Sequence, residues 1–142
     1  MRVVTFLAQF AIVQPNNLLS VINAPIDSIA VGGAHAIVAI VYVDWLETNI
    51  RHTLTLQLYD AEGKLVRSGP DNDSYRVSLP VEIGRPAGVP RGMTFKLPLA
   101  LNLSGLHIEP GIYEWRVSLG DMHHADWNTS FLLLGESSSG KV

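Results

Sequence analysis

The chain has 142 residues, of which 47% are hydrophobic and 16% are charged, and its formal net charge is −3. Because no long run of Lys or Arg is present, the sequence lacks the electrostatic surface of a dedicated nucleic-acid-binding protein. The chain has no cysteine, which excludes disulfides, thiolate metal sites and a cysteine nucleophile. We expect a cytoplasmic protein with one hydrophobic core and some apolar surface left over for partners.

The first predicted element is an apolar strand at residues 3–13. Together with Arg2 it imitates a signal peptide, but the basic region is weak and no Ala-x-Ala cleavage site follows Val13. Two further segments, residues 36–45 and 131–134, are also apolar at nearly every position. We predict that these three segments bury both faces or lie at an interface. None has an unbroken apolar run long enough to span a bilayer, so we predict no membrane span.

Four other segments alternate between apolar and polar residues with a period of two, which places every second side chain on one face of a strand. They are residues 53–59, 75–83, 95–103 and 113–119. Trp115 falls in the inward register of the last one and is predicted to be a core residue. Pro80 and Pro98 interrupt two of these strands at outward positions. A strand tolerates such a proline only at the edge of a sheet or at a bulge.

Turn residues separate all these segments, and no amphipathic helix longer than about two turns is evident. The pattern predicts an all-β fold, a two-sheet antiparallel β-sandwich of eight or nine strands that resembles immunoglobulin or C2 domains. We assign residues 1–135 to this single domain. Residues 136–142, which are rich in Ser and Gly, are predicted to form a flexible tail.

Several segments resemble a bacterial family of small proteins that carry a domain of unknown function. The matching segments are Asn17–Ile22, the Gly32-Gly33 pair, the Asp-x-x-Gly-Lys hairpin at 60–64, the loop 84–92 with the strand that starts at Leu97, and Pro-Gly-x-Tyr at 110–113. The block from residue 84 onward is the distinctive part. The resemblance implies a β-sandwich and assigns no activity and no site residues.

The strongest candidates for a binding site are two arginines and two tryptophans. Arg85 and Arg91 flank the Pro- and Gly-rich loop, which would hold two guanidinium groups near each other for planar recognition of carboxylates or of a partner's backbone. The alternative is that both are solvated charges that keep a long loop soluble. Trp45 and Trp127 lie at strand ends beside Asp44 and Asp126, so we predict that both are partly exposed and serve as anchors for a partner.

A second hypothesis is a metal or small-ligand site formed by loop residues. His123 and His124, with Asp121 and Asp126, are the one cluster of metal-competent side chains, and a turn at Gly120-Asp121 would be needed to aim both histidines at one ion. The alternative is a solvated hairpin tip. Asp71-Asn72-Asp73 resembles part of a calcium loop but lacks the glycine and the distal glutamate of an EF-hand.

No nucleophile elbow and no phosphate-binding loop are present in the sequence. We therefore predict a non-catalytic module without a cofactor that binds another protein or itself, as a homo-oligomer or as a subunit of a complex. An enzyme whose residues meet only in three dimensions stays open.

Overall fold

The computed structural model describes residues 1–135, and the predicted C-terminal tail at 136–142 lies outside the described residues. The predicted all-β fold is confirmed. The described part contains thirteen β-strands, two short 3-10 helices and no α-helix. Many of the strands are two to four residues long, which is why the sequence, read from its longer patterns, predicted only eight or nine. Within residues 1–135, no helix is long and apolar enough to cross a membrane.

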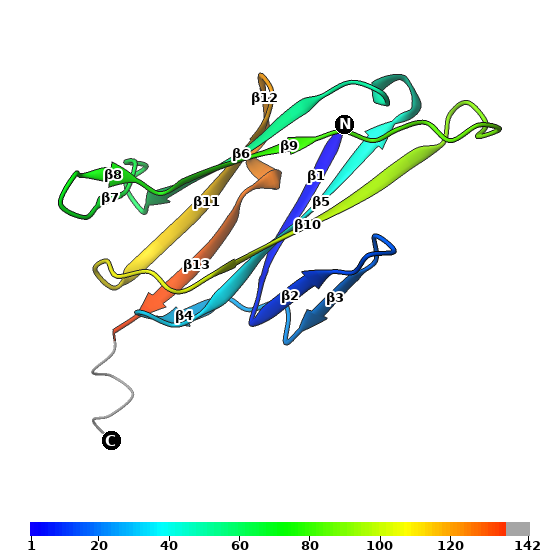
Figure 1. The fold of residues 1–142 in the computed structure, drawn as a ribbon. Helices are drawn as coiled ribbons and strands as arrows, with labels where there is room; N and C mark the ends of the chain where they lie inside the picture. The colour runs from blue at the N-terminus through cyan, green and yellow to red at the C-terminus, as the bar shows by residue number, and fades with distance from the viewer. Residues whose placement is uncertain (136–142) are drawn as a thin grey trace.

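Nine of the strands form two large sheets (Figure 1). The three-stranded sheet has the order β1 (Arg2–Ala8), β5 (His35–Asp44), β10 (Thr94–Leu103). The six-stranded sheet has the order β4 (Ser28–Ala30), β13 (Thr129–Leu134), β11 (Gly111–Leu119), β6 (His52–Asp60), β9 (Arg76–Val81), and β12 (Met122–His123) adds to β11. All pairings in these sheets are antiparallel except that of β4 with β13, which is parallel. The prediction of purely antiparallel sheets is wrong at this one position.

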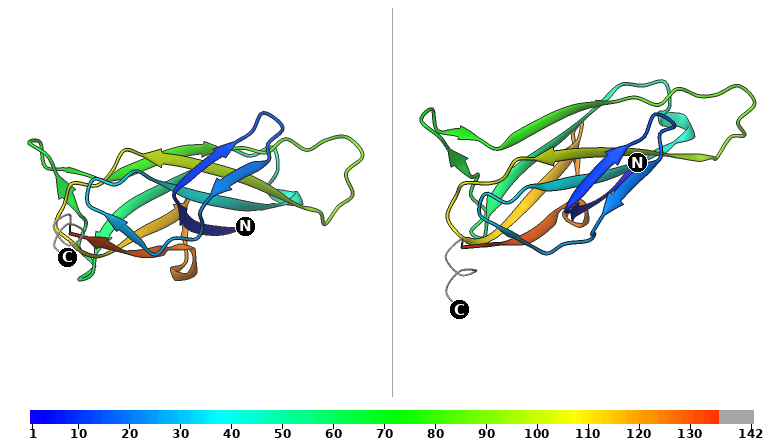
Figure 2. Two further views of the ribbon diagram at one scale, coloured as in Figure 1. Left: turned by 90° about the horizontal axis from the view of Figure 1, so that it is seen from below. Right: turned by 60° about the horizontal axis from the view of Figure 1, so that its bottom comes forward.

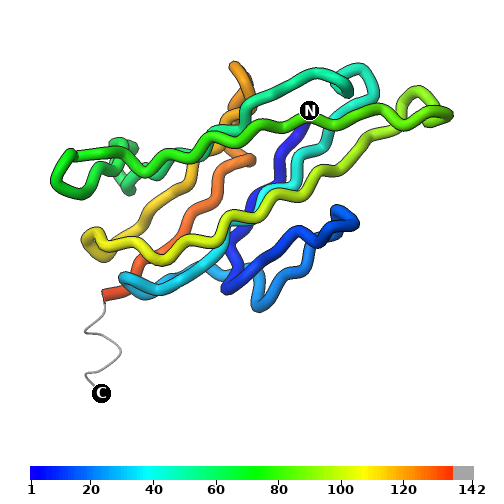
Figure 3. The backbone as a smooth tube through the Cα atoms, in the orientation of Figure 1, coloured from blue at the N-terminus to red at the C-terminus, as the bar shows by residue number. Residues whose placement is uncertain are grey.

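The four remaining strands form two hairpins. Strands β2 (Phe10–Val13) and β3 (Leu19–Ile22) pair with each other, as do β7 (Arg67–Ser68) and β8 (Asp73–Ser74). The β2–β3 hairpin lies beside the three-stranded sheet, whereas the β7–β8 hairpin extends from the far end of the molecule (Figure 3). A small cluster of buried side chains joins the β2–β3 hairpin to the three-stranded sheet; its buried members are Ala8, Ala11, Ala36 and Val38.

The main core is built from the inner faces of both large sheets. Val3 and Val41 from the three-stranded sheet belong to the same buried cluster as Leu58, Trp115 and Leu133 from the six-stranded sheet. The alternating apolar positions of β6 and β11 supply most of the six-stranded sheet's share, as their period of two predicts. Trp115 is buried, which confirms its predicted place in the core.

The three apolar segments are buried to different degrees. The prediction that residues 36–45 bury both faces is confirmed, because β5 is the central strand of its sheet and the β2–β3 hairpin covers part of its outer face. For residues 131–134, burial of both faces is wrong, and the alternative that they lie at an interface stays a prediction. There Phe131 and Leu133 point into the core, while Leu132 and Leu134 are exposed on the outer face of the six-stranded sheet. The first segment divides at Gln9 into β1 and β2.

Both prolines mark sheet edges, as predicted. Pro80 lies on β9 and Pro98 lies on β10, and each of these strands ends the strand order of its sheet. A missing N–H on the outer side of an edge strand removes no ladder hydrogen bond.

The first strand is also tied to the last part of the described chain. The Thr5 hydroxyl donates to the backbone carbonyl of Trp127 at 2.6 Å. Trp127 ends the 3-10 helix η2 (Ala125–Trp127), which leads into β13. The long strands run roughly along one direction, so the molecule is elongated along them (Figure 2).

Candidate functional site

One end of the molecule brings three of the four predicted binding residues together around one indole ring. Trp45 begins the 3-10 helix η1 (Trp45–Glu47), which follows directly from β5. The loop between β9 and β10 folds back toward this helix, where the N–H of Asn49 donates to the carbonyl of Ile83 at 2.8 Å. The guanidinium carbon of Arg85 lies 3.5 Å from the centroid of the Trp45 ring, and that of Arg91 lies 5.0 Å from it. Both distances are in the range of cation–π contacts.

Arg85 is held in place by hydrogen bonds as well as by the ring. Its Nε donates to Thr48 Oγ1 at 2.8 Å, and its Nη2 donates to the carbonyl of Trp45 at 3.0 Å. Its backbone N–H donates to Asn49 Oδ1 at 3.1 Å. Thr48 is buried, so these bonds fix the guanidinium against a rigid part of the structure. Arg85 thus positions the loop and the indole.

Arg91 is exposed and makes neither a hydrogen bond nor an ion pair with any described residue. The two loops at this end also carry large apolar side chains in contact with solvent: Leu46, which is 73% exposed, Ile50 and Met93. Tryptophan, tyrosine and arginine are the residues that most often dominate binding energy at protein interfaces. We call Trp45, Arg85, Arg91, Leu46, Ile50 and Met93 the arginine end.

Neither arginine of the arginine end takes part in an ion pair with a described residue. The ion pairs between described residues are Met1–Asp44, Lys64–Glu62 and Arg116–Glu114, and none of them includes Arg85 or Arg91. A chain with a net charge of −3 therefore presents two guanidinium groups at one end with no carboxylate bonded to either. An anionic group of a partner would meet open hydrogen-bond donors there.

The fourth predicted residue, Trp127, does not belong to this end. It is 2% exposed, so the prediction of partial exposure is wrong. Its ring packs against that of His124, with the ring centroids 4.7 Å apart, and its carbonyl accepts the Thr5 hydroxyl bond. Asp126 beside it is exposed, but the short helix η2 turns the indole into the main core.

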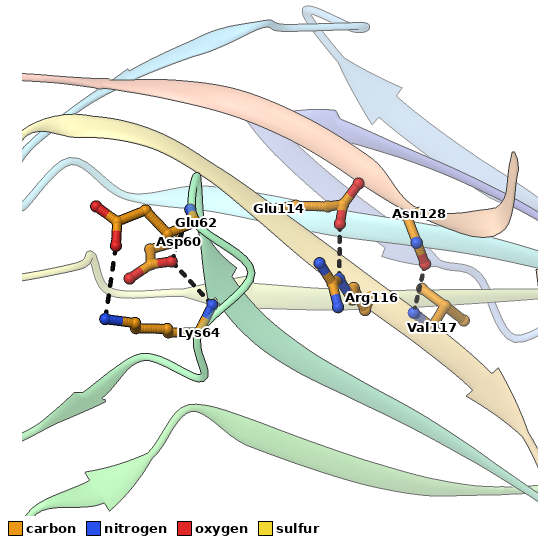
Figure 4. A network of polar contacts seen from close by, with 7 residues as sticks. All are labelled: Asp60, Glu62, Lys64, Glu114, Arg116, Val117 and Asn128. Carbon is orange, nitrogen blue, oxygen red and sulfur yellow. Dashed lines mark hydrogen bonds and ion pairs between the residues drawn. The ribbon is translucent and has the colours of Figure 1, made fainter. Parts of the chain in front are cut away.

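A polar hollow of about 510 Å³ lies on the outer face of the six-stranded sheet. Arg116 donates to Glu114 at 2.8 Å (Figure 4). The Arg116 guanidinium carbon also lies 4.2 Å from the Tyr59 ring centroid. Asn128 accepts the Val117 N–H at 2.9 Å. The lining also includes His123 and His124, both named by the metal and small-ligand hypothesis. The structure places these two histidines beside one hollow without joining them to Asp121 or Asp126.

The described residues contain no group of three or more His, Cys, Asp or Glu side chains placed to hold a metal ion. The sequence also allowed Asp44, Asp60 or Asp71 to meet from neighbouring loops as a calcium site, but in the structure these carboxylates have other partners or lie apart. Asp44 pairs with the N-terminal amine, and Asp60 accepts the backbone N–H groups of Glu62 and Lys64 in its own turn. Asp71 is exposed in the β7–β8 turn. Neither metal hypothesis gains support from residues 1–135.

A larger and more open hollow, of about 1150 Å³, lies at the opposite end, near Tyr113. The Tyr113 hydroxyl donates to the carbonyl of Glu109 at 2.5 Å. Burial raises the pKa of Tyr113, and the charges of Asp60 and Glu109 raise it further. His107 lines the same hollow. The Tyr113 hydroxyl already donates its hydrogen to the backbone, so that hydrogen is not free to bond a ligand in this hollow.

Sequence reasoning found the arginines but missed the polar hollow. The outward register of Glu114 and Arg116 was visible in the alternation of β11, yet the pairing with Tyr59 depends on the register between β11 and β6. Phe10 and Ile12 belong to the segment 3–13, which was predicted to bury both faces or to lie at an interface. Both side chains are exposed on the β2–β3 hairpin, so burial of both faces is wrong there and the interface stays a prediction.

No protein-family model matches the chain, and no curated protein sequence is significantly similar to it.

Proposed function

We propose that this protein is a non-catalytic interaction module that binds another protein, or a second copy of itself, through the arginine end. The observation that carries the proposal is the convergence of Arg85 and Arg91 on one indole ring, with Arg91 left without any hydrogen bond or ion pair to a described residue. Arg85 supplies a rigid platform and Arg91 a free donor group, and exposed apolar side chains surround them. Rigid aromatic anchors next to free arginine donors suit a protein surface that carries carboxylates.

The same proposal includes a two-sheet sandwich of the immunoglobulin or C2 type. Two observations support it: side chains from both large sheets share one core, and the Tyr113 hydroxyl bonds to the backbone four residues upstream. The second arrangement resembles the tyrosine corner of immunoglobulin-like sandwiches. Membership of the bacterial family of unknown function, a cytoplasmic location and the absence of a cofactor stay predictions alongside it.

Affinity purification from extracts of the source cells, with the tagged protein as bait, tests the proposed partner-binding role. Arg91→Glu reverses the free charge at the arginine end, and Arg76→Glu makes the same change at an exposed position of β9, outside that end. We expect a partner that is recovered with the wild type and with Arg76→Glu but lost with Arg91→Glu, and whose affinity is then measured by calorimetry. Identical recovery with both variants, or no specific partner with the wild type, would refute the binding of another protein at the arginine end. Sedimentation of the wild type and Arg91→Glu tests self-association at the same end, and a dimer that is equally stable in both would refute it.

A second candidate function is the binding of a small polar ligand in the hollow on the six-stranded sheet. It is favoured by the position of His123 and His124 beside Arg116 at one concave surface. A thermal-shift screen with sugars, amino acids and nucleotides tests it. A compound that stabilises the wild type should lose its effect in a His123→Ala/His124→Ala variant, and the absence of any stabilising compound removes this candidate.

A further inference from the structure

The β2–β3 hairpin belongs to an uncharged part of the chain. Residues 3–26 contain no Asp, Glu, Lys, Arg or His. Four large apolar side chains of the hairpin are nevertheless exposed: Phe10, Ile12, Leu18 and Ile22. Leu18, which directly precedes β3, is 63% exposed, and Ile22, the last residue of β3, is 54% exposed. Exposing such a surface to water costs free energy, and this free energy is recovered when a partner covers the surface.

One edge of this hairpin is already closed by a side chain. The Asn102 amide group donates to the carbonyl of Ala11 at 2.7 Å and accepts the N–H of Ala11 at 3.3 Å. These two backbone groups of β2 therefore point away from β3. In an antiparallel ladder, the residue opposite then also points its N–H and C=O outward. Val21 is the partner of Ala11, so the N–H and C=O of Val21 point away from β2. Leu19 lies two residues earlier on the same strand, so its N–H and C=O point in the same direction.

The outer edge of β3 consequently presents the N–H and C=O groups of Leu19 and Val21. Among the described strands, β3 pairs only with β2. In Figure 1 it forms the lower margin of the hairpin, on the side away from the sheets. These groups are in the arrangement that accepts another strand.

Other sheet edges of the molecule carry features that oppose strand addition. Strand β9 carries Pro80 and Arg76, β10 carries Pro98 and Lys96, and β4 has only three residues. The remaining edge strand of the large sheets, β1, begins with the charged Arg2 and is bonded through the Thr5 hydroxyl to the carbonyl of Trp127. Prolines, charged side chains and short length are the usual protections of an edge strand. Strand β3 is also short, at four residues, but its sequence, Leu-Ser-Val-Ile, contains neither a proline nor a charged side chain.

We propose that β3 pairs antiparallel with β3 of a second copy of this chain around a two-fold axis at Ser20. In this register Leu19 of one copy lies opposite Val21 of the other, and the outward backbone groups of both close a ladder. Leu18 then lies opposite Ile22 of the second copy on the exposed face, which covers the two most exposed apolar side chains of the hairpin. Since each copy carries a net charge of −3, the uncharged hairpin is where two copies meet without opposed like charges. The contact is small, so the population of dimer depends on concentration.

This inference does not depend on the proposed function, because Arg85 and Arg91 lie on other loops of the chain. Sedimentation equilibrium of the full chain over a range of concentrations, with the wild type and Arg91→Glu, separates the two. Both proteins should dimerise equally. A dimer lost in Arg91→Glu, or a wild type that stays monomeric at the highest concentration, overturns the pairing of β3.

Substitutions at Ser20 test the register, because this exposed side chain would face its own symmetry mate. Ser20→Lys and Ser20→Glu should each raise the dissociation constant by about tenfold through like-charge repulsion, and a mixture of the two should restore dimers. The matched control, Ile112→Lys, places the same charge on an exposed apolar position of β11 and should dimerise as the wild type does. Dimers that persist in Ser20→Lys, or that dissociate in Ile112→Lys, would place the interface elsewhere.

A cross-linking experiment gives an independent readout. The chain contains no cysteine, so a Ser20→Cys variant carries a single thiol. In the proposed register the two thiols lie in a non-hydrogen-bonded pair, whose Cα separation of about 4.5 Å is within disulfide range. Mild oxidation should yield a disulfide-linked dimer faster than it does for Ile112→Cys. Equal rates for the two variants would contradict the proposal.

Discussion

Gly105 lies against the backbone of Gly32, so closely that a Cβ atom on Gly105 would be 2.6 Å from the carbonyl carbon and oxygen of Gly32. The N–H of Gly32 also donates to the carbonyl of Leu106 at 2.9 Å. The loop before β5 and the loop after β10 thus cross with direct contact between their backbones. Only glycine fits at the crossing, and Gly105 has a φ of +138°, which L side chains rarely adopt.

We expect Gly105→Ala to lower the free energy of unfolding by roughly 3 kcal/mol or more, because backbone on both sides would have to move. Gly88→Ala is the matched control. It also has a positive φ, +83°, but no atom lies within 4 Å of its added Cβ. Its cost should be about 1 kcal/mol, from backbone strain alone. Urea denaturation measures both, and equal losses would show that the crossing is not tight.

Asn102 offers a second prediction, because its amide replaces a neighbouring strand for Ala11. Asn102→Leu should lower the free energy of unfolding by about 2 kcal/mol, since two buried backbone groups lose their partners. Amide hydrogen exchange should accelerate in β2 and β3 more than in β5. Asn16→Ala removes a comparable bond in the exposed turn of the same hairpin and should cost less than about 0.5 kcal/mol. An equal effect of the two variants would argue against a clamp at Asn102.

His35 should make stability depend on pH. Burial lowers the pKa of His35 below its ordinary value of 6.5, although its bond to the Gly33 carbonyl opposes the shift. The unfolded chain therefore takes up the proton at a higher pH than the folded chain does. The free energy of unfolding should fall as pH drops below about 6.5, and the loss should end once pH passes the lowered pKa of the folded state. Nε2 of His35 is buried without a hydrogen-bond partner among the described residues, so protonation would place a charge on it.

Urea denaturation at about pH 7.5 and about pH 5.5 measures this dependence. His35→Gln should remove the part of this loss in the free energy of unfolding that comes from His35. If the free energy of unfolding of His35→Gln falls between these two pH values as much as that of the wild type, the pH dependence comes from other groups.

Arg85 and Arg91 should differ in their effect on stability. Arg85→Ala removes two side-chain hydrogen bonds and the closer ring contact, and should lower the free energy of unfolding by about 1–2 kcal/mol. Arg91→Ala loses only an exposed ring contact and should cost less than about 0.5 kcal/mol. Chemical denaturation checks the stabilities, and hydrogen exchange in residues 45–49 checks the loop. Comparable losses for both variants would mean that Arg91 is also a structural residue.

The strands with a clear period of two were predictable from sequence because the pattern is local. Residues 53–59 and 113–119 became β6 and β11 with the expected faces inside. The two prolines were equally informative, since a missing N–H restricts a strand to an edge whatever the tertiary fold. The exposure of Leu132 and Leu134 was not predictable in this way, because it depends on which elements cover the outer face of β13.

The arginine end was predictable only in part. Arg85 and Arg91 are six positions apart on a loop whose prolines and glycines are visible in the sequence. Their convergence on Trp45 depends on the packing of two loops that are distant in the chain. The place of Trp127 in the core could not be inferred from its acidic neighbour, because Thr5 and the turn of η2 determine it.

The hydrogen bond from Thr5 to Trp127 bears on how the protein is made in the cell. The first strand leaves the ribosome early, but its partner in this bond is synthesised 122 positions later. β13 likewise pairs with β4 near the start of the chain. Contacts of such long sequence separation form slowly. Completion of the fold must therefore await synthesis of β13, and until then β1 and β4 lack these partners.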